Sequence, residues 1–319
     1  MPSVDTSTMI DSLAVAAPML LLSGMGVVMM VLSAVMRPYP GKLFWGVASL
    51  TLALALALVA ANAGQPATDA FSGMLRIDAY GNFFASVSLV AAMLSLMVSE
   101  SYLERIGVRV GEFYSLVLFG VTGMLGMAYS NDLMMVFISL EVMSIAMYVL
   151  CAIKRADERA VESGFKYFIL GAFSSGIMLY GVSFIYGVTG STSLSQLAAW
   201  LVTHPDENSL LAVGGVLVMV GFGFKVAAVP FHFWAPDVYQ GAPTNVAALM
   251  ASGVKAASFA AFGRFVIGAL GDDTATWACA LWIMAALTML IGNIGALAQA
   301  DLKRKLSYKP IARARNSHI

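Results

Sequence analysis

The feature that most constrains this chain is a series of apolar blocks, each long enough to cross a bilayer as a helix. Lipid offers no partners for backbone N–H and C=O groups, so only helices and closed barrels can span a membrane. The strands of a barrel would alternate apolar and polar residues over about 10 positions, and these blocks do not alternate. The pattern therefore predicts an all-α, polytopic membrane protein.

The composition leaves too little polar surface for a water-soluble globule. Of the 319 residues, 60% are hydrophobic and 11% are charged, whereas soluble domains carry about 25% charged residues. The formal net charge is zero, so the sequence predicts neither a nucleic-acid partner nor any other partner that needs a strongly charged surface.

We predict about nine transmembrane helices, of which the seventh is long and interrupted. The connections between the helices carry proline and glycine, which break helices. The predicted spans are 12–36, 43–62, 78–99, 112–129, 132–153, 161–187, 209–240, 243–269 and 275–298.

The distribution of Lys and Arg predicts how these spans are oriented. Inner connections of membrane proteins are enriched in basic residues. If the N-terminus lies outside, Arg76 is the one basic residue in an outer connection, and all other connecting segments with Lys or Arg fall inside. Four basic residues lie within spans, and these are Lys166, Lys225, Lys255 and Arg264.

The outer connection before the seventh span is predicted to hold an amphipathic helix that lies on the membrane. Leu194 and Leu197 share one helix face, and Trp200 suits the interface. Ser193 and Gln196 have the spacing of a capping box at its start.

Three ionisable residues are predicted near the bilayer centre, namely Glu141, Lys225 and Lys255. Each costs roughly 2.5–3.5 kcal/mol there if it is ionised, so they must pair, share a hydrated interior or be neutralised. A static pair of Glu141 with Lys225 is one interpretation. We favour a proton or ion path, because Lys255 is surplus to one pair and a buried lysine changes its pKa readily.

Other candidate residues lie near an expected break in the seventh span. Pro230 follows Lys225 by five residues and disrupts the helix turn before it. A broken helix at membrane depth is tolerated where it lines a cavity, and transporters use such breaks as ion sites. His232 lies just beyond and could relay protons or be only a polar residue at the break. Lys166 could belong to the path or could extend to the membrane interface.

Soluble cofactor motifs are not found in the sequence. It contains no P-loop, no CxxC and no HExxH. We therefore expect this chain to bind no NAD, flavin, haem, iron–sulfur cluster or metal.

Three strings resemble one family of membrane proteins. They are KVAAVPFHFWAPDVYQGAPT at 225–244, SLEVMSIAMYVL at 139–150 and KYFILGAFSS at 166–175. These strings are similar to the antiporter-like membrane subunits of NADH:quinone oxidoreductase, respiratory complex I, and most similar to the subunit N branch.

The resemblance implies a fold with two inverted five-helix repeats and a broken seventh helix. It divides the chain into a three-helix accessory segment at 1–108, a first repeat at 109–270 and the start of a second repeat at 271–319. The family continues into a tenth helix where this chain carries a short basic tail. We therefore expect a C-terminally truncated chain that, as it stands, is incompetent in proton pumping.

The resemblance also implies a function. The chain would translocate protons within NADH:quinone oxidoreductase, coupled to quinone reduction, through Glu141, Lys225, Lys255 and Lys166. His232 is added to these as a possible relay because of its place at the helix break. NADH and quinone would be used by the complex, with flavin and iron–sulfur clusters in other subunits. Its partners would be other membrane subunits and the lipid of the bacterial inner membrane. The alternatives are a cation/proton antiporter component of the Mrp type and a non-functional truncated scaffold.

Overall fold

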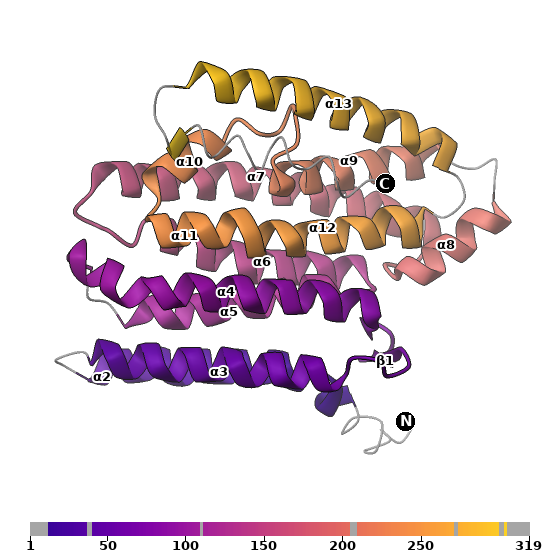
Figure 1. Cartoon of the computed structure of the whole chain (residues 1–319). Helices are drawn as coiled ribbons and strands as arrows, with labels where there is room; N and C mark the ends of the chain where they lie inside the picture. Colours follow the sequence, from indigo (N-terminus) through magenta and orange to yellow (C-terminus); the bar gives the residue numbers. More distant parts are fainter. Residues whose placement is uncertain are drawn as a thin grey trace. The chain divides into compact units, whose positions relative to one another are not determined.

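The structure is a computed structural model that describes residues 12–36, 40–108, 111–204, 209–270, 274–299 and 303–304 (Figure 1). Nine helical segments within these ranges are long and apolar enough to cross a membrane, which confirms the predicted all-α fold and number of spans. The elements are α2 (Ala17–Val35), α3 (Gly41–Ala61), β1 (Thr68–Ala70), β2 (Leu75–Ile77), α4 (Ala79–Arg105), α5 (Glu112–Tyr129), α6 (Leu133–Cys151), α7 (Glu158–Thr189), α8 (Leu194–Thr203), α9 (Ser209–Val226), α10 (Ala235–Gly241), α11 (Thr244–Leu249), η1 (Met250–Val254), α12 (Lys255–Gly263), η2 (Arg264–Ala269) and α13 (Thr274–Ala298).

The first of two compact units comprises residues 1–150 and 248–261. Within it α3 packs against α2 and α4, and α5 packs against α2 and α4. The buried residues of α4 recur every three or four positions, as in Ala85, Leu89 and Ala92, which places them on one helix face. Because lipid provides little hydrophobic drive, such faces associate through close packing of small residues.

A glycine allows α5 and α6 to come together within this unit. A Cβ atom at Gly123 would lie 2.5 Å from the backbone nitrogen of Met143 and from the carbonyl oxygen of Ser139. No side chain larger than hydrogen fits at that contact.

A short β-hairpin joins α3 to α4, and the sequence did not indicate it. Thr68 pairs with Ile77, and Ala70 pairs with Leu75, in an antiparallel register. The hairpin is tied to the turn between α5 and α6, because the Asn131 N–H donates to the Met74 carbonyl (2.8 Å). Two connections that were both predicted outside therefore lie at the same end of this unit.

The second unit comprises residues 151–247 and 262–319, and α7 and α9 form its main helix pair. The two helices cross at glycines: a Cβ at Gly181 would lie 2.7 Å from the Gly214 carbonyl oxygen. Helix α10 packs on α7, and α8 packs on η2. Both α8 and η2 belong to the predicted outer side.

Helix α8 confirms the predicted helix in the outer connection, but the predicted capping box was wrong. Ser193 precedes α8 as its N-cap residue, yet its side chain accepts no capping hydrogen bond. The Ser193 hydroxyl instead lies 3.1 Å from the Ser195 hydroxyl, and the Ser193 N–H donates to the Ser191 hydroxyl (3.1 Å). Neighbouring serines thus compete for the groups that a capping box would use.

Candidate functional site

The seventh span is broken as predicted, and the break begins one helix turn before Pro230. Helix α9 ends at Val226, and α10 starts at Ala235. The N–H groups of Ala227 and Ala228 donate to the carbonyls of Phe224 (3.0 Å) and Gly223 (2.8 Å). This pattern is a Schellman motif, which closes a helix end and satisfies its last carbonyls.

Lys225 lies in the last turn of α9 and is only 1% exposed. Its ammonium nitrogen is 5.4 Å from the centre of the Tyr167 ring and 5.8 Å from that of Phe224. Aromatic faces attract a cation, and so does the C-terminal end of a helix. The surroundings of Lys225 therefore suit a charged lysine deep inside protein.

Trp234 completes the aromatic surroundings from the far side of the break. Its ring stacks on Tyr167, with centroids 4.6 Å apart and planes 7° apart. Its indole N–H also donates to the Phe224 carbonyl (2.8 Å). Sequence reasoning missed these two aromatic residues, because their approach depends on how α7 packs against the break.

The break also contacts α13. The Val229 N–H donates to the Thr288 hydroxyl (2.9 Å). This bond satisfies a buried backbone donor that helix continuity would otherwise satisfy.

Lys166 is half-exposed and paired with two carboxylates. Its ammonium lies 2.7 Å from Glu162, one turn earlier on α7, and 3.2 Å from Asp237 on α10. Arg304 lies 3.0 Å from the other oxygen of Asp237. Sequence reasoning missed Asp237 and Arg304. The i,i+4 spacing of Glu162 and Lys166 was a usable signal for the first pair.

These charges border a polar pocket of about 290 Å³ within the second unit. Its lining residues come from the first turns of α7 and from α10, and they are Arg159, Glu162, Ser163, Lys166, Asp237, Gln240 and Gly241. The pocket can hold several water molecules beside the ion pairs, since one water occupies about 30 Å³ of liquid.

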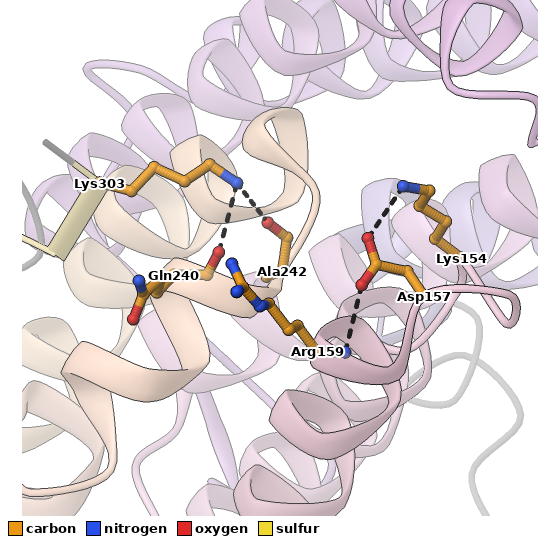
Figure 2. Close-up of polar contacts among 6 residues, drawn as sticks. All are labelled: Lys154, Asp157, Arg159, Gln240, Ala242 and Lys303. Carbon is orange, nitrogen blue, oxygen red and sulfur yellow. Dashed lines mark hydrogen bonds and ion pairs between the residues drawn. The ribbon is translucent and has the colours of Figure 1, made fainter. Parts of the chain in front are cut away.

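Figure 2 shows two groups of polar contacts in the second unit, one at the end of α10 and one at the start of α7. The Lys303 ammonium donates to the carbonyls of Ala242 (3.0 Å) and Gln240 (3.4 Å), just where α10 ends. Asp157 caps α7 and accepts from the Lys154 ammonium (2.8 Å). This hydrogen bond holds the pKa of the Asp157 carboxyl below its usual value.

His232 lies between α9 and α10 and is partly buried. Its Nδ1 atom is buried and has no hydrogen-bond partner among the residues that the structure describes. The side chain thus lies at the break, as the sequence predicted, and its role as a relay stays a prediction.

Glu141 and Lys255 belong to the first unit. Glu141 lies near the middle of α6 and is half-buried. Lys255 is 6% exposed and lies where the π-helical turn η1 passes into α12. Short π-helical turns are frequent at functional sites, and the sequence did not predict this one. A pair between Glu141 and Lys225 stays a prediction.

Within the described ranges, no group of three or more His, Cys, Asp or Glu side chains could hold a metal ion. The acidic residues at the polar pocket face lysine and arginine instead.

Comparison with known proteins decides the family. The family described as "NADH:quinone oxidoreductase/Mrp antiporter, TM" matches residues 130–314, which is more than half of the chain. The chain belongs to this family. The matched residues include α6, the broken helix and the charged cluster around Asp237.

Similarity to individual proteins of known type supports this family assignment. The chain is 41% identical over 305 residues to NADH-quinone oxidoreductase subunit N of Trichlorobacter lovleyi, covering 95% of this chain and 62% of that protein. A chain of respiratory complex I from Thermus thermophilus matches with a TM-score of 0.78 and 36% identity, over 93% of this chain and 62% of that chain. This chain therefore spans about three fifths of the length of these members of the family.

The fold is shared more widely. A chain of the Mrp complex from Dietzia sp. DQ12-45-1b matches with a TM-score of 0.78 at 24% identity, over 93% of this chain and 57% of that chain. At that level of identity the likeness concerns the fold alone.

Proposed function

We propose that this chain acts as subunit N of a proton-pumping NADH:quinone oxidoreductase. The proposal is supported by the identity to curated subunits N and by the likeness to a chain of a solved complex I. The observation that carries the mechanism is Lys225, an almost fully buried lysine at the end of a broken transmembrane helix.

Lys225 would be the central proton carrier. An ionised lysine at membrane depth costs roughly 2.5–3.5 kcal/mol. The Tyr167 and Phe224 rings and the end of α9 offset part of that cost. A lysine balanced in this way can bind a proton and release it when a nearby charge changes.

The other candidates would take positions before and after Lys225 along the path. Glu141 would sense the charge change that quinone reduction causes elsewhere in the complex. Lys255 would pass the proton onward. Lys166 and His232, which lie near the break between α9 and α10, would relay protons there. The partners would be the other membrane subunits, whereas flavin, iron–sulfur clusters, NADH and quinone would belong to other parts of the complex.

The first prediction tests Lys225 in the complex as the cell makes it. Replacing Lys225→Ala at the chromosomal locus should suppress NADH-driven proton uptake by inverted membrane vesicles, because the buried carrier is removed. Glu141→Ala and Lys255→Ala should show related losses. Full proton uptake by an assembled Lys225→Ala complex would refute the carrier role.

Two controls separate pumping from assembly and from antiporter activity. NADH oxidation with an artificial electron acceptor reports how much complex is assembled, and it should stay unchanged in Lys225→Ala. Sodium-dependent proton exchange without NADH would instead favour an antiporter of the Mrp type.

A further inference from the structure

The position of α10 is not set by helix continuity. Residues 227–234 are irregular, so α10 can move relative to α9 unless other contacts hold it. Contacts with α7 and with Lys303 and Arg304 hold it, as does the hydrogen bond from the Trp234 indole at its start to the Phe224 carbonyl of α9.

Asp237 is at the centre of these contacts. One of its carboxylate oxygens lies 3.2 Å from the Lys166 ammonium, and the other lies 3.0 Å from the Arg304 guanidinium. Lys303 binds the carbonyls at the end of α10. Asp237 therefore joins α10 both to α7 and to the segment at Arg304.

The same two helices meet a second time next to Lys225. Tyr167 follows Lys166 directly on α7, and Trp234 precedes Asp237 by three residues at the start of α10. The Tyr167–Trp234 stack and the Lys166–Asp237 ion pair are thus neighbouring contacts between α7 and α10. A shift of α10 that broke the ion pair would also disturb the ring stack beside the Lys225 ammonium.

A glycine makes the approach of α10 to α7 close. A Cβ atom at Gly241 would lie 2.6 Å from the Ser163 Cβ atom. Because the two helices are tightly packed there, a small displacement of α10 alters its whole contact with α7. The Lys166–Asp237 ion pair and the Tyr167–Trp234 stack would therefore change together.

We propose that Asp237 is a positioning residue for proton transfer, which holds the Tyr167–Trp234 stack in register beside Lys225. This inference rests on the proposed function and extends it to a residue outside the buried path. The ion pairs of Asp237 are partly exposed, with 42% of the Lys166 side chain and 38% of the Asp237 side chain accessible. Such pairs contribute little to folding stability, so their loss should affect proton transfer more than assembly.

The test replaces Asp237→Asn at the chromosomal locus, which removes the charge and keeps the size. We expect at least an about twofold loss of NADH-driven proton uptake per assembled complex, since small misplacements of a reacting group are costly. Asp237→Glu keeps the charge and should recover most of the uptake. Asp157→Asn is the matched control, because Asp157 also pairs with a lysine at this end, and its partners, the Lys154 ammonium and the Arg159 N–H, do not belong to α10.

A double-mutant cycle tests the route through Arg304. Arg304→Gln should lower proton uptake, and adding it to Asp237→Asn should lower the uptake by less than the sum of the two single effects. Additive effects would overturn the proposal, and so would unchanged uptake in Asp237→Asn. A loss of uptake that merely follows a loss of assembled complex would overturn it as well.

Lys225→Ala, measured in parallel, separates this inference from the proposed function. Loss of uptake in Lys225→Ala together with normal uptake in Asp237→Asn would overturn the positioning role alone. Normal uptake in both variants would overturn the proposed function and the positioning role with it.

Discussion

Ala227 holds a backbone conformation that glycine usually holds. Its φ is 56°, directly after α9 ends, and it is fully buried. The left-handed conformation costs an L-residue with a Cβ roughly 1–2 kcal/mol. The backbone is therefore strained two residues from Lys225. The position of that lysine matters for the proposed function.

The second prediction concerns this strain. Ala227→Gly should leave the stability of the chain unchanged or raise it by about 1 kcal/mol, because glycine adopts the left-handed conformation without a Cβ penalty. Ala228→Gly, at the next buried position and without a positive φ, should lower stability by about 0.4–1 kcal/mol, because glycine gives the unfolded chain more conformational freedom. Thermal unfolding of the purified protein in detergent measures both. Equal destabilisation by the two variants would show that Ala227 is not strained.

At the scale of elements, the pair α7 and α9 depends on glycines that face each other. A Cβ at Gly181 would lie 2.8 Å from the Leu217 Cβ atom, and one at Gly214 would lie 2.9 Å from the Gly181 carbonyl oxygen. Helices in lipid associate through such close contacts. This crossing supports α9, which carries Lys225 at its end.

The third prediction compares two glycines of α7. Gly181→Val should destabilise the α7–α9 pair by about 1–3 kcal/mol, because the added atoms overpack the crossing. Gly176→Val is the matched control, since no atom lies within 4 Å of a Cβ at that position. The amount of chain in the membrane and its thermal stability in detergent report the difference. If both variants behaved alike, helix propensity rather than packing would explain the loss.

At the scale of the whole molecule, contacts within each unit agree with the alternation of predicted inner and outer connections. In the first unit the hairpin meets the turn between α5 and α6, and both were predicted outside. In the second unit the turn after α10 meets Lys303, and both were predicted inside. The side of the membrane on which each end lies is still a prediction from the distribution of basic residues.

The fourth prediction tests that orientation. Reporter fusions after residues 40, 66, 158 and 272 should report inside, outside, inside and outside, respectively. Each fusion is separated from the next by an odd number of spans, so neighbours must alternate. Two consecutive fusions on the same side would contradict the predicted order of spans.

The sequence by itself determined the class of protein, the number of spans and the costly charges within them. These properties depend on local composition compared with a bilayer of known thickness, so they can be read along the chain. Glu141, Lys225 and Lys255 were found in this way. The break after Lys225 was also predictable, because proline acts on its own helix turn. The division at 108 and 270 and the proton-transfer roles stay predictions.

Only the tertiary structure decided which groups surround those charges. Lys166 and Asp237 are 71 positions apart in the chain, and they meet because α10 packs on α7. The same packing brings Tyr167 and Trp234 together beside Lys225. Local periodicity shows which face of a helix is apolar, but it does not show which distant helix covers that face or in which register. The partners of the buried charges are therefore a property of the packed helices.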